Sequence, residues 1–200
     1  MRIGSSELIC LAILGWSLLA WRFPALLERS LFSTRALCRG EWWRLLGYGF
    51  VHADAAHLLF NLIALFSFGR AVAPFFDRHF PLGGFLGFYL SALPVALIPA
   101  LLRHRRGGDY RALGASGAVS AVVFAFVLFE PRALLLVLFV PMPAILFALL
   151  FLAYGLWGAR RDRGRIAHEV HLAGACWGLL VAVLLAPGAA LDFPRRLLAP

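Results

Sequence analysis

The sequence predicts an all-α integral membrane protein in which six helices cross the bilayer and form one bundle. Hydrophobic residues make up 62% of the 200 positions and charged residues only 14%, whereas about 25% of residues are charged in average soluble domains. The apolar residues are gathered into runs of about 20, the length that a helix needs to cross the hydrocarbon core. All 19 basic residues are arginines, and most lie between these runs, which favours lipid headgroups over nucleic acid as partners.

Six apolar segments account for the membrane-crossing helices. We place them at residues 8–27, 55–76, 82–102, 113–129, 133–157 and 170–189. The first run has only Arg2 ahead of it and continues to residue 27, so we interpret it as a retained helix rather than a signal peptide. Pro141 and Pro143 are expected to kink the fifth helix. The connections leave no room for a soluble domain, and residues 1–200 are expected to form a single membrane domain.

The connection over residues 28–51 is the longest, and it is not purely polar. It contains Trp42, Trp43 and Tyr48. Tryptophan and tyrosine favour the membrane interface, where one edge of the ring is apolar and the other is hydrated. We therefore expect this loop to lie partly in the interface.

The second helix carries two polar residues at membrane depth. His57 and Asn61 are four residues apart and share one helix face. Polar groups inside apolar helices are costly and need a partner or a wet cavity. Taken alone, the pair fits either an interhelical hydrogen bond or two donors that converge on an anion.

The fourth helix begins with the run Gly114-Ala-Ser116-Gly117. Small residues are ordinary at tight helix contacts in membranes, so this run alone is a weak signal. Ser116, however, lies just inside the start of the helix, where free backbone N–H groups and the positive end of the dipole favour an anion. The flanking glycines also allow a substrate backbone to come close.

The sixth helix presents a face that is small except for one histidine. Its members are His171, Gly174, Ala175 and Gly178. Gly117 and Ala121 give the fourth helix a matching small face, and close packing of the two would bring Ser116 near His171. A lone histidine on an apolar face is more often structural. Here the second, fourth and sixth helices all begin on the same side of the membrane, so His57, Ser116 and His171 are expected at one depth.

These residues resemble the motifs of the rhomboid family of intramembrane serine proteases, of the compact six-helix kind. The His-x4-His-x3-Asn pattern of the family is matched by His52, His57 and Asn61. Its GxSG pattern is matched by residues 114–117, its His-x-x-Gly pattern by His171 and Gly174, and its Trp-Arg pair by Trp43 and Arg44. The resemblance covers most of the chain, from about residue 40 to about residue 186.

The resemblance implies a role for each matched residue. Ser116 would be the nucleophile and His171 the general base of a catalytic dyad. His57 and Asn61, with the backbone at Gly114 and Ser116, would form the oxyanion and substrate site. The supporting residues would be His52, Gly117, Gly174, Trp43 and Arg44. The substrates would be transmembrane segments of other membrane proteins.

One of the departures from the family pattern concerns the support of His171. Many rhomboids place an aromatic residue four positions after the nucleophile, where it stacks on the catalytic histidine. Ser120 occupies that position here. The ring of His171 would then lean on Gly117 and on another aromatic side chain.

Other functions are also open to a protein of this composition. A catalytically inactive rhomboid relative that binds or escorts membrane proteins would have the same fold. An intramembrane metalloprotease needs H-E-x-x-H, and residues 168–171 are one residue short of it. Cys10, Cys38 and Cys176 lack metal-ligand spacing, and nothing in the sequence calls for a metal or an organic cofactor. A transporter would be expected to have repeated halves, which are not evident.

The resemblance and the charge distribution predict opposite orientations. The family places the active-site end outside the cytoplasm, which would put most of the 19 arginines there. The rule that short cytoplasmic loops carry the excess of Lys and Arg favours the reverse. Compactness and arginine richness suggest a bacterial inner membrane, and the sequence does not specify the oligomeric state.

Overall fold

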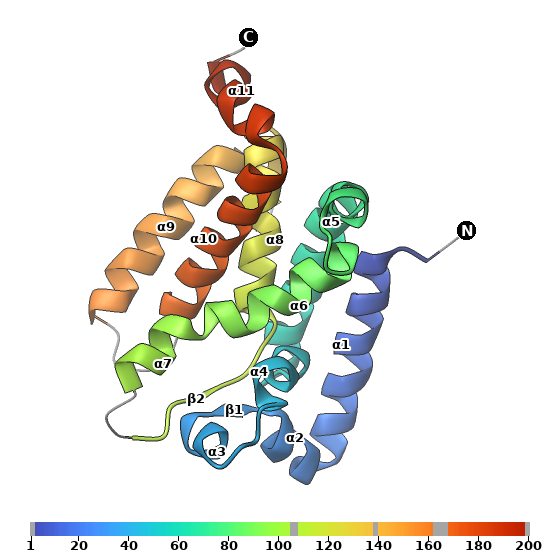
Figure 1. The fold of residues 1–200 in the computed structure, drawn as a ribbon, viewed down its shortest axis with the longest axis vertical. Coiled ribbons are helices and arrows are strands. Elements are labelled where there is room, and N and C mark those ends of the chain that lie inside the picture. Colours follow the sequence, from blue (N-terminus) through green and yellow to red (C-terminus); the bar gives the residue numbers. More distant parts are fainter. Residues whose placement is uncertain (1–2, 105–107, 138–139, 162–167, 199–200) are drawn as a thin grey trace.

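The computed structural model describes residues 3–104, 108–137, 140–161 and 168–198, which fold into a bundle of helices (Figure 1). The helices are α1 (Ser5–Arg22), α2 (Pro24–Ser30), α3 (Thr34–Cys38), α4 (Arg44–Gly47), the 3-10 helix η1 (Tyr48–Phe50), α5 (Ala55–His79), α6 (Gly84–Ala96), α7 (Ile98–His104), α8 (Ser116–Phe129), α9 (Ala144–Arg161), α10 (His168–Leu185) and α11 (Pro187–Leu198). Two short antiparallel strand pairs accompany them: β1 (Phe32–Ser33) with β2 (Arg111–Ala112), and β3 (Leu134–Val137) with β4 (Val140–Pro143).

Helix α8 is the centre of the bundle. It packs most extensively against α10 and also against α5, α6 and α9, and its side chains are buried along nearly its whole length. The elements α2, α3, α4, β1 and β2 gather at the end where α8 begins, whereas α11 lies at the opposite end (Figure 1). The first residue of α8, Ser116, therefore faces the segment that links α1 to α5.

Three helical segments within the described residues are long and apolar enough to cross a membrane. They are Ala55–His79, Gly84–His104 and His168–Leu185. Ser116–Phe129 and Ala144–Gly158 are apolar but shorter. The mostly helical membrane fold expected from the sequence is confirmed, while the number of six spans stays a prediction. Arg2, Arg105, Arg106, Arg163 and Arg165, which bear on the orientation, lie outside the described residues.

Proline explains two differences from the predicted helices. The first helix ends at Arg22 instead of residue 27, because Phe23 is extended (φ −124°, ψ 90°) ahead of Pro24, as residues before proline tend to be. The third segment is divided into α6 and α7 at Leu97. Pro94 and Pro99 flank this break and have no N–H to donate to the helix ladder. The second helix runs three residues further than predicted, to His79.

The predicted fifth helix is wrong at its start, ahead of Ala144. Strands β3 (Leu134–Val137) and β4 (Val140–Pro143) pair there instead, and the N–H of Ala144 donates to the carbonyl of Ala133 at 2.9 Å. Pro141 and Pro143 lie in β4, so they exclude the helix from this segment instead of kinking it. Helix α9 begins only at Ala144.

The last predicted helix is also shorter than expected, because α10 ends at Leu185 ahead of Pro187. The chain then forms the unpredicted α11. The guanidinium of Arg196 donates to the carbonyl of Phe129 at 2.8 Å, which joins α11 to the end of α8.

Candidate active site

Ser116 is the first residue of α8, and the segment before it is held by backbone hydrogen bonds. The N–H of Gly114 donates to the carbonyl of Tyr48 at 2.8 Å. Gly114 has φ +112°, a conformation that favours glycine. A Cβ at Gly114 would lie 2.6 Å from Cε1 of His57, so glycine also leaves room for that ring.

His52 fixes the residue immediately before Ser116. Its side chain is fully buried, and its Nε2 accepts the N–H of Ala115 at 3.2 Å. Because Nε2 accepts, the ring proton lies on Nδ1 and is donated to Oγ of Ser17 at 3.0 Å. The hydroxyl of Ser17 donates in turn to the carbonyl of Phe50 at 2.9 Å. This chain of hydrogen bonds connects α1 to the start of α8.

His171 lies on α10 with its ring against the Ser116 hydroxyl. The distance from Nε2 of His171 to Oγ of Ser116 is 2.6 Å, and both residues are only part-buried. With the ring proton on Nδ1, Nε2 accepts the hydroxyl proton. The pair has the geometry in which a histidine activates a serine.

The close approach of α8 and α10 brings these two side chains together. A Cβ at Gly174 would collide with the carbonyl oxygen of Gly117, and one at Gly178 would collide with the carbonyl oxygen of Ala121. The two helix backbones are therefore in direct contact, and the packing predicted from the small faces is confirmed. Figure 1 shows the two helices side by side along their length.

The ring of His57 lies beside the residues that precede Ser116. It packs edge-on against His52 with ring centroids 4.9 Å apart and fills the space at Gly114. Asn61 is buried, and its amide donates to the carbonyl of His57 at 2.8 Å. One amide hydrogen of Asn61 is thus used within α5, and the other makes no hydrogen bond with any residue that the structure describes.

An aromatic contact to His171 comes from a residue that the sequence did not single out. The ring of Phe151 on α9 lies 6.1 Å from the His171 ring, centroid to centroid, with an interplanar angle of 43°. Ser120, at the position where many rhomboids have an aromatic residue, instead donates its hydroxyl to the carbonyl of Ser116 at 2.8 Å. Phe151 is therefore the other aromatic side chain that was expected beside His171.

Arg44 organises the segment between α1 and α5, at a distance from the serine. It is buried, its Nη1 donates to the carbonyls of Glu28 (2.5 Å) and Leu31 (2.7 Å), and its Nη2 lies 2.7 Å from Glu41. The indole of its neighbour Trp43 donates to the carbonyl of Arg29 at 3.2 Å. Both residues of the Trp-Arg pair thus stabilise this segment.

Sequence reasoning missed Ser17 and Phe151. A signal existed for Ser17, because it is a hydroxyl within an apolar run. None existed for Phe151, which is one of many aromatic residues in the chain. Across the residues that the structure describes, no three His, Cys, Asp or Glu side chains are grouped to hold a metal ion.

The fold and the site together define a membrane-embedded helical protein with a serine and a histidine in hydrogen-bond contact. The rhomboid domain model matches residues 39–188. RHOMBOID-like protein 12 of Arabidopsis thaliana mitochondria is 32% identical to this chain, over 68% of this chain and 44% of its own length. Rhomboid protein 1 of Saccharomyces cerevisiae mitochondria is 30% identical, over 76% of this chain and 44% of its own length. Rhomboid protease GluP of Bacillus subtilis is 40% identical over 42% of this chain and 15% of its own length.

The chain belongs to the rhomboid family. It is an integral membrane protein, as its apolar helices also indicate. It spans less than half of the length of each of the three relatives. These come from mitochondria and from a bacterium, so the bacterial inner membrane stays a prediction.

Proposed function

We propose that this protein is an intramembrane serine endopeptidase that cleaves transmembrane segments of other membrane proteins. The observation that carries the proposal is the 2.6 Å contact between Oγ of Ser116 and Nε2 of His171. The two groups come from different helices, 55 residues apart in the chain. A relative named rhomboid protease GluP supports the same activity.

In the proposed reaction, Ser116 attacks the scissile carbonyl while His171 takes the hydroxyl proton. His171 then returns this proton to the leaving amine, and water hydrolyses the acyl-enzyme in a second round. Among the residues that the structure describes, no carboxylate forms a hydrogen bond with His171, so its ring depends on the packing of α8, α10 and Phe151 for its position.

The negative charge on the tetrahedral intermediate would be stabilised at the start of α8. The backbone N–H of Ser116 belongs to the first helical turn, whose N–H groups lack intrahelical partners. His57 lies next to Gly114, and Asn61 retains one free amide hydrogen. Loss of one such donor typically lowers the rate by about 10²- to 10³-fold.

Labelling with a fluorophosphonate probe tests the proposal on the purified, detergent-solubilised protein. We expect the wild type to be labelled and the variants Ser116→Ala and His171→Ala to remain unlabelled. Ser120→Ala is the matched control, because it removes a hydroxyl one turn further along the same helix and should still be labelled.

An inactive rhomboid relative that binds membrane proteins is the alternative function. It predicts no labelling of a folded wild-type sample, or equal labelling of the wild type and Ser116→Ala. Either result would overturn the protease proposal.

A further inference from the structure

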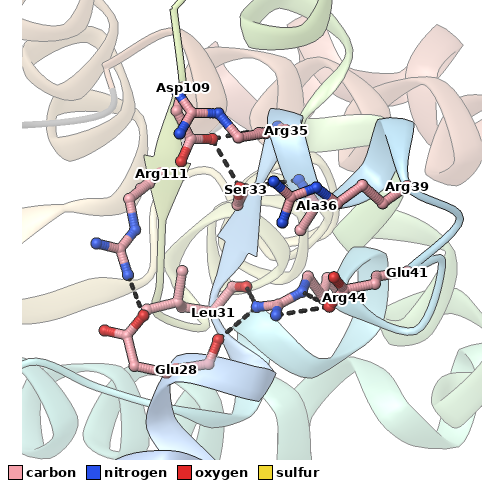
Figure 2. A pocket seen from close by; sticks show the side chains of 10 residues that line it. All are labelled: Glu28, Leu31, Ser33, Arg35, Ala36, Arg39, Glu41, Arg44, Asp109 and Arg111. Atoms are coloured by element: carbon pink, nitrogen blue, oxygen red, sulfur yellow. Dashed lines mark hydrogen bonds and ion pairs between the residues drawn. The ribbon is translucent and has the colours of Figure 1, made fainter.

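A polar cavity lies in the segment between α1 and α5, away from the proposed dyad. Its volume is about 300 Å³, within the range of small-ligand sites. Side chains of this segment line it together with two residues at β2, as Figure 2 shows: Glu28, Leu31, Ser33, Arg35, Ala36, Arg39, Glu41, Arg44, Asp109 and Arg111. Four arginines thus face three carboxylates, which leaves one net positive charge.

Two of these arginines are already neutralised. Arg44 pairs with Glu41 at 2.7 Å, and Arg111 pairs with Glu28. Both ion pairs are drawn in Figure 2 and lie at the edge of the cavity that is nearest to α2 and α4. Neither Glu28 nor Glu41 is therefore free to neutralise a second arginine.

The third carboxylate is held by other donors. Asp109 accepts the hydroxyl of Ser33 at 2.6 Å and the backbone N–H of Arg35 at 3.2 Å. Partial desolvation raises the pKa of Asp109, but these hydrogen bonds and the charges of Arg35 and Arg111 outweigh it and hold the pKa below its ordinary value. Asp109 is thus ionised at neutral pH and anchors the backbone of α3.

Arg35 and Arg39 are the two other arginines of the cavity, and the charge of Arg35 already acts on Asp109. They are exposed and four residues apart, and their guanidinium groups make no hydrogen bond or ion pair with any residue that the structure describes. Figure 2 shows both on the side of the cavity formed by α3. Guanidinium groups bind phosphate by two parallel hydrogen bonds. A phosphate group suits this side of the cavity, where two guanidinium groups face the single carboxylate of Asp109.

The surroundings of the cavity indicate the kind of phosphate compound. Trp42 and Trp43, which are 65% and 57% exposed, stand between Glu41 and Arg44 in the sequence. Exposed tryptophans favour the depth of lipid headgroups. A free phosphate compound gains nothing from these indoles, whereas the glycerol and upper acyl chains of a phospholipid would contact them.

We propose that this cavity binds the phosphate headgroup of an anionic phospholipid, with Arg35 and Arg39 on the phosphate and Trp42 and Trp43 against the apolar part of the lipid. The proposal rests on the cavity, its charges and the two exposed tryptophans that lie between Glu41 and Arg44 in the sequence. It does not depend on whether Ser116 is catalytic.

The test is native mass spectrometry of the full chain, released from non-ionic detergent and titrated with dioleoyl phosphatidylglycerol or dioleoyl phosphatidylcholine. We expect the wild type to bind phosphatidylglycerol about tenfold more tightly, which corresponds to one charge-assisted hydrogen bond. The double variant Arg35→Gln/Arg39→Gln should lose this preference. Arg195→Gln/Arg196→Gln removes the same charge from α11, at the other end of the bundle, and should keep it.

Three outcomes would overturn the proposal. An equal loss in both double variants would mean that net charge, and not the cavity, attracts the lipid. Equal binding of phosphatidylglycerol and phosphatidylcholine by the wild type would mean that the cavity does not select an anionic phospholipid. Displacement by an equal concentration of soluble glycerol phosphate would assign the site to a free phosphate compound. Circular dichroism of both double variants checks that they are folded.

Discussion

Helix α10 contacts two of its neighbours, α8 and α9, in different ways. Toward α8 it presents Gly174 and Gly178, and the contact is made by backbone atoms. Toward α9 the contact is made by side chains: Phe151 lies 6.1 Å from the ring of His171, and Tyr154 lies 5.1 Å from the ring of His168. The first interface has no flexible atoms to adjust, whereas the second has many.

The difference has a consequence for the proposed dyad. The distance between Ser116 and His171 is set across the backbone interface, because the two residues lie at the start of α8 and near the start of α10. The side-chain interface with α9 influences only the tilt of the ring of His171. The proposed pair is thus held where the packing is least adjustable.

The largest effect is expected from Gly174→Ala, which breaks the backbone interface. The added methyl would collide with the carbonyl oxygen of Gly117, a backbone atom that cannot move alone. Overpacking of this kind costs about 1–3 kcal/mol, and a displacement of about 1 Å at the dyad can lower the rate about 100-fold. Cleavage of a model transmembrane substrate and the unfolding temperature in detergent measure the two effects.

Gly155→Ala on α9 is the matched control for that variant. Its added methyl would lie 3.0 Å from Cδ2 of Leu172, the end of a flexible side chain. We expect activity within about twofold of the wild type and a stability change below about 1 kcal/mol. Equal damage by the two substitutions would contradict the distinction between the interfaces.

A smaller effect is expected from His52→Ala, which loosens the start of α8 but leaves its contact with α10 intact. The N–H of Ala115 loses its acceptor, so the backbone before Ser116 is free to shift. We expect kcat to fall about 10- to 100-fold with little change in KM, because the residue positions the site without touching the substrate.

Two further variants separate positioning from folding at His52. His52→Gln retains a side-chain acceptor for the N–H of Ala115 and should recover part of kcat. Ser17→Ala keeps the bond from His52 to Ala115 and removes the partner of Nδ1 together with the bond to the carbonyl of Phe50, so its effect should be smaller. A His52→Gln variant as inactive as His52→Ala would argue against the proposed role.

Much of the site was predictable from the sequence, because its residues are polar or small in an apolar chain. Ser116, His171 and His57 stand out against their helices, and the spacing of Gly174 and Gly178 indicates the face that packs on α8. The second, fourth and sixth predicted helices begin on the same side of the membrane, so these residues are expected at one depth. The prediction of a tight α8–α10 contact was correct for these physical reasons.

The rest depended on information that an apolar run does not carry. Residues 133–157 are hydrophobic in the hairpin and in the helix alike, so hydropathy did not separate β3 and β4 from α9. Pro141 and Pro143 are evident in the sequence, but prolines at these positions are compatible both with a kink inside a helix and with a helix that begins after them. The contact between Phe151 and His171 was not predictable, since any aromatic residue on a lipid-facing helix has the same local signal.

The smallest effect is expected from Phe151→Ala, which disturbs only the side-chain interface. Without this ring, His171 loses an aromatic neighbour on the α9 side but keeps its hydrogen bond to Ser116. We expect kcat to fall about threefold to tenfold, since a contact of this kind contributes about 0.5–1.5 kcal/mol. Leu150→Ala removes an adjacent side chain that is 53% exposed and should leave kcat unchanged. A loss as large as that of Gly174→Ala would mean that α9 also fixes the dyad, and both faces of α10 would then have to be treated as parts of the site.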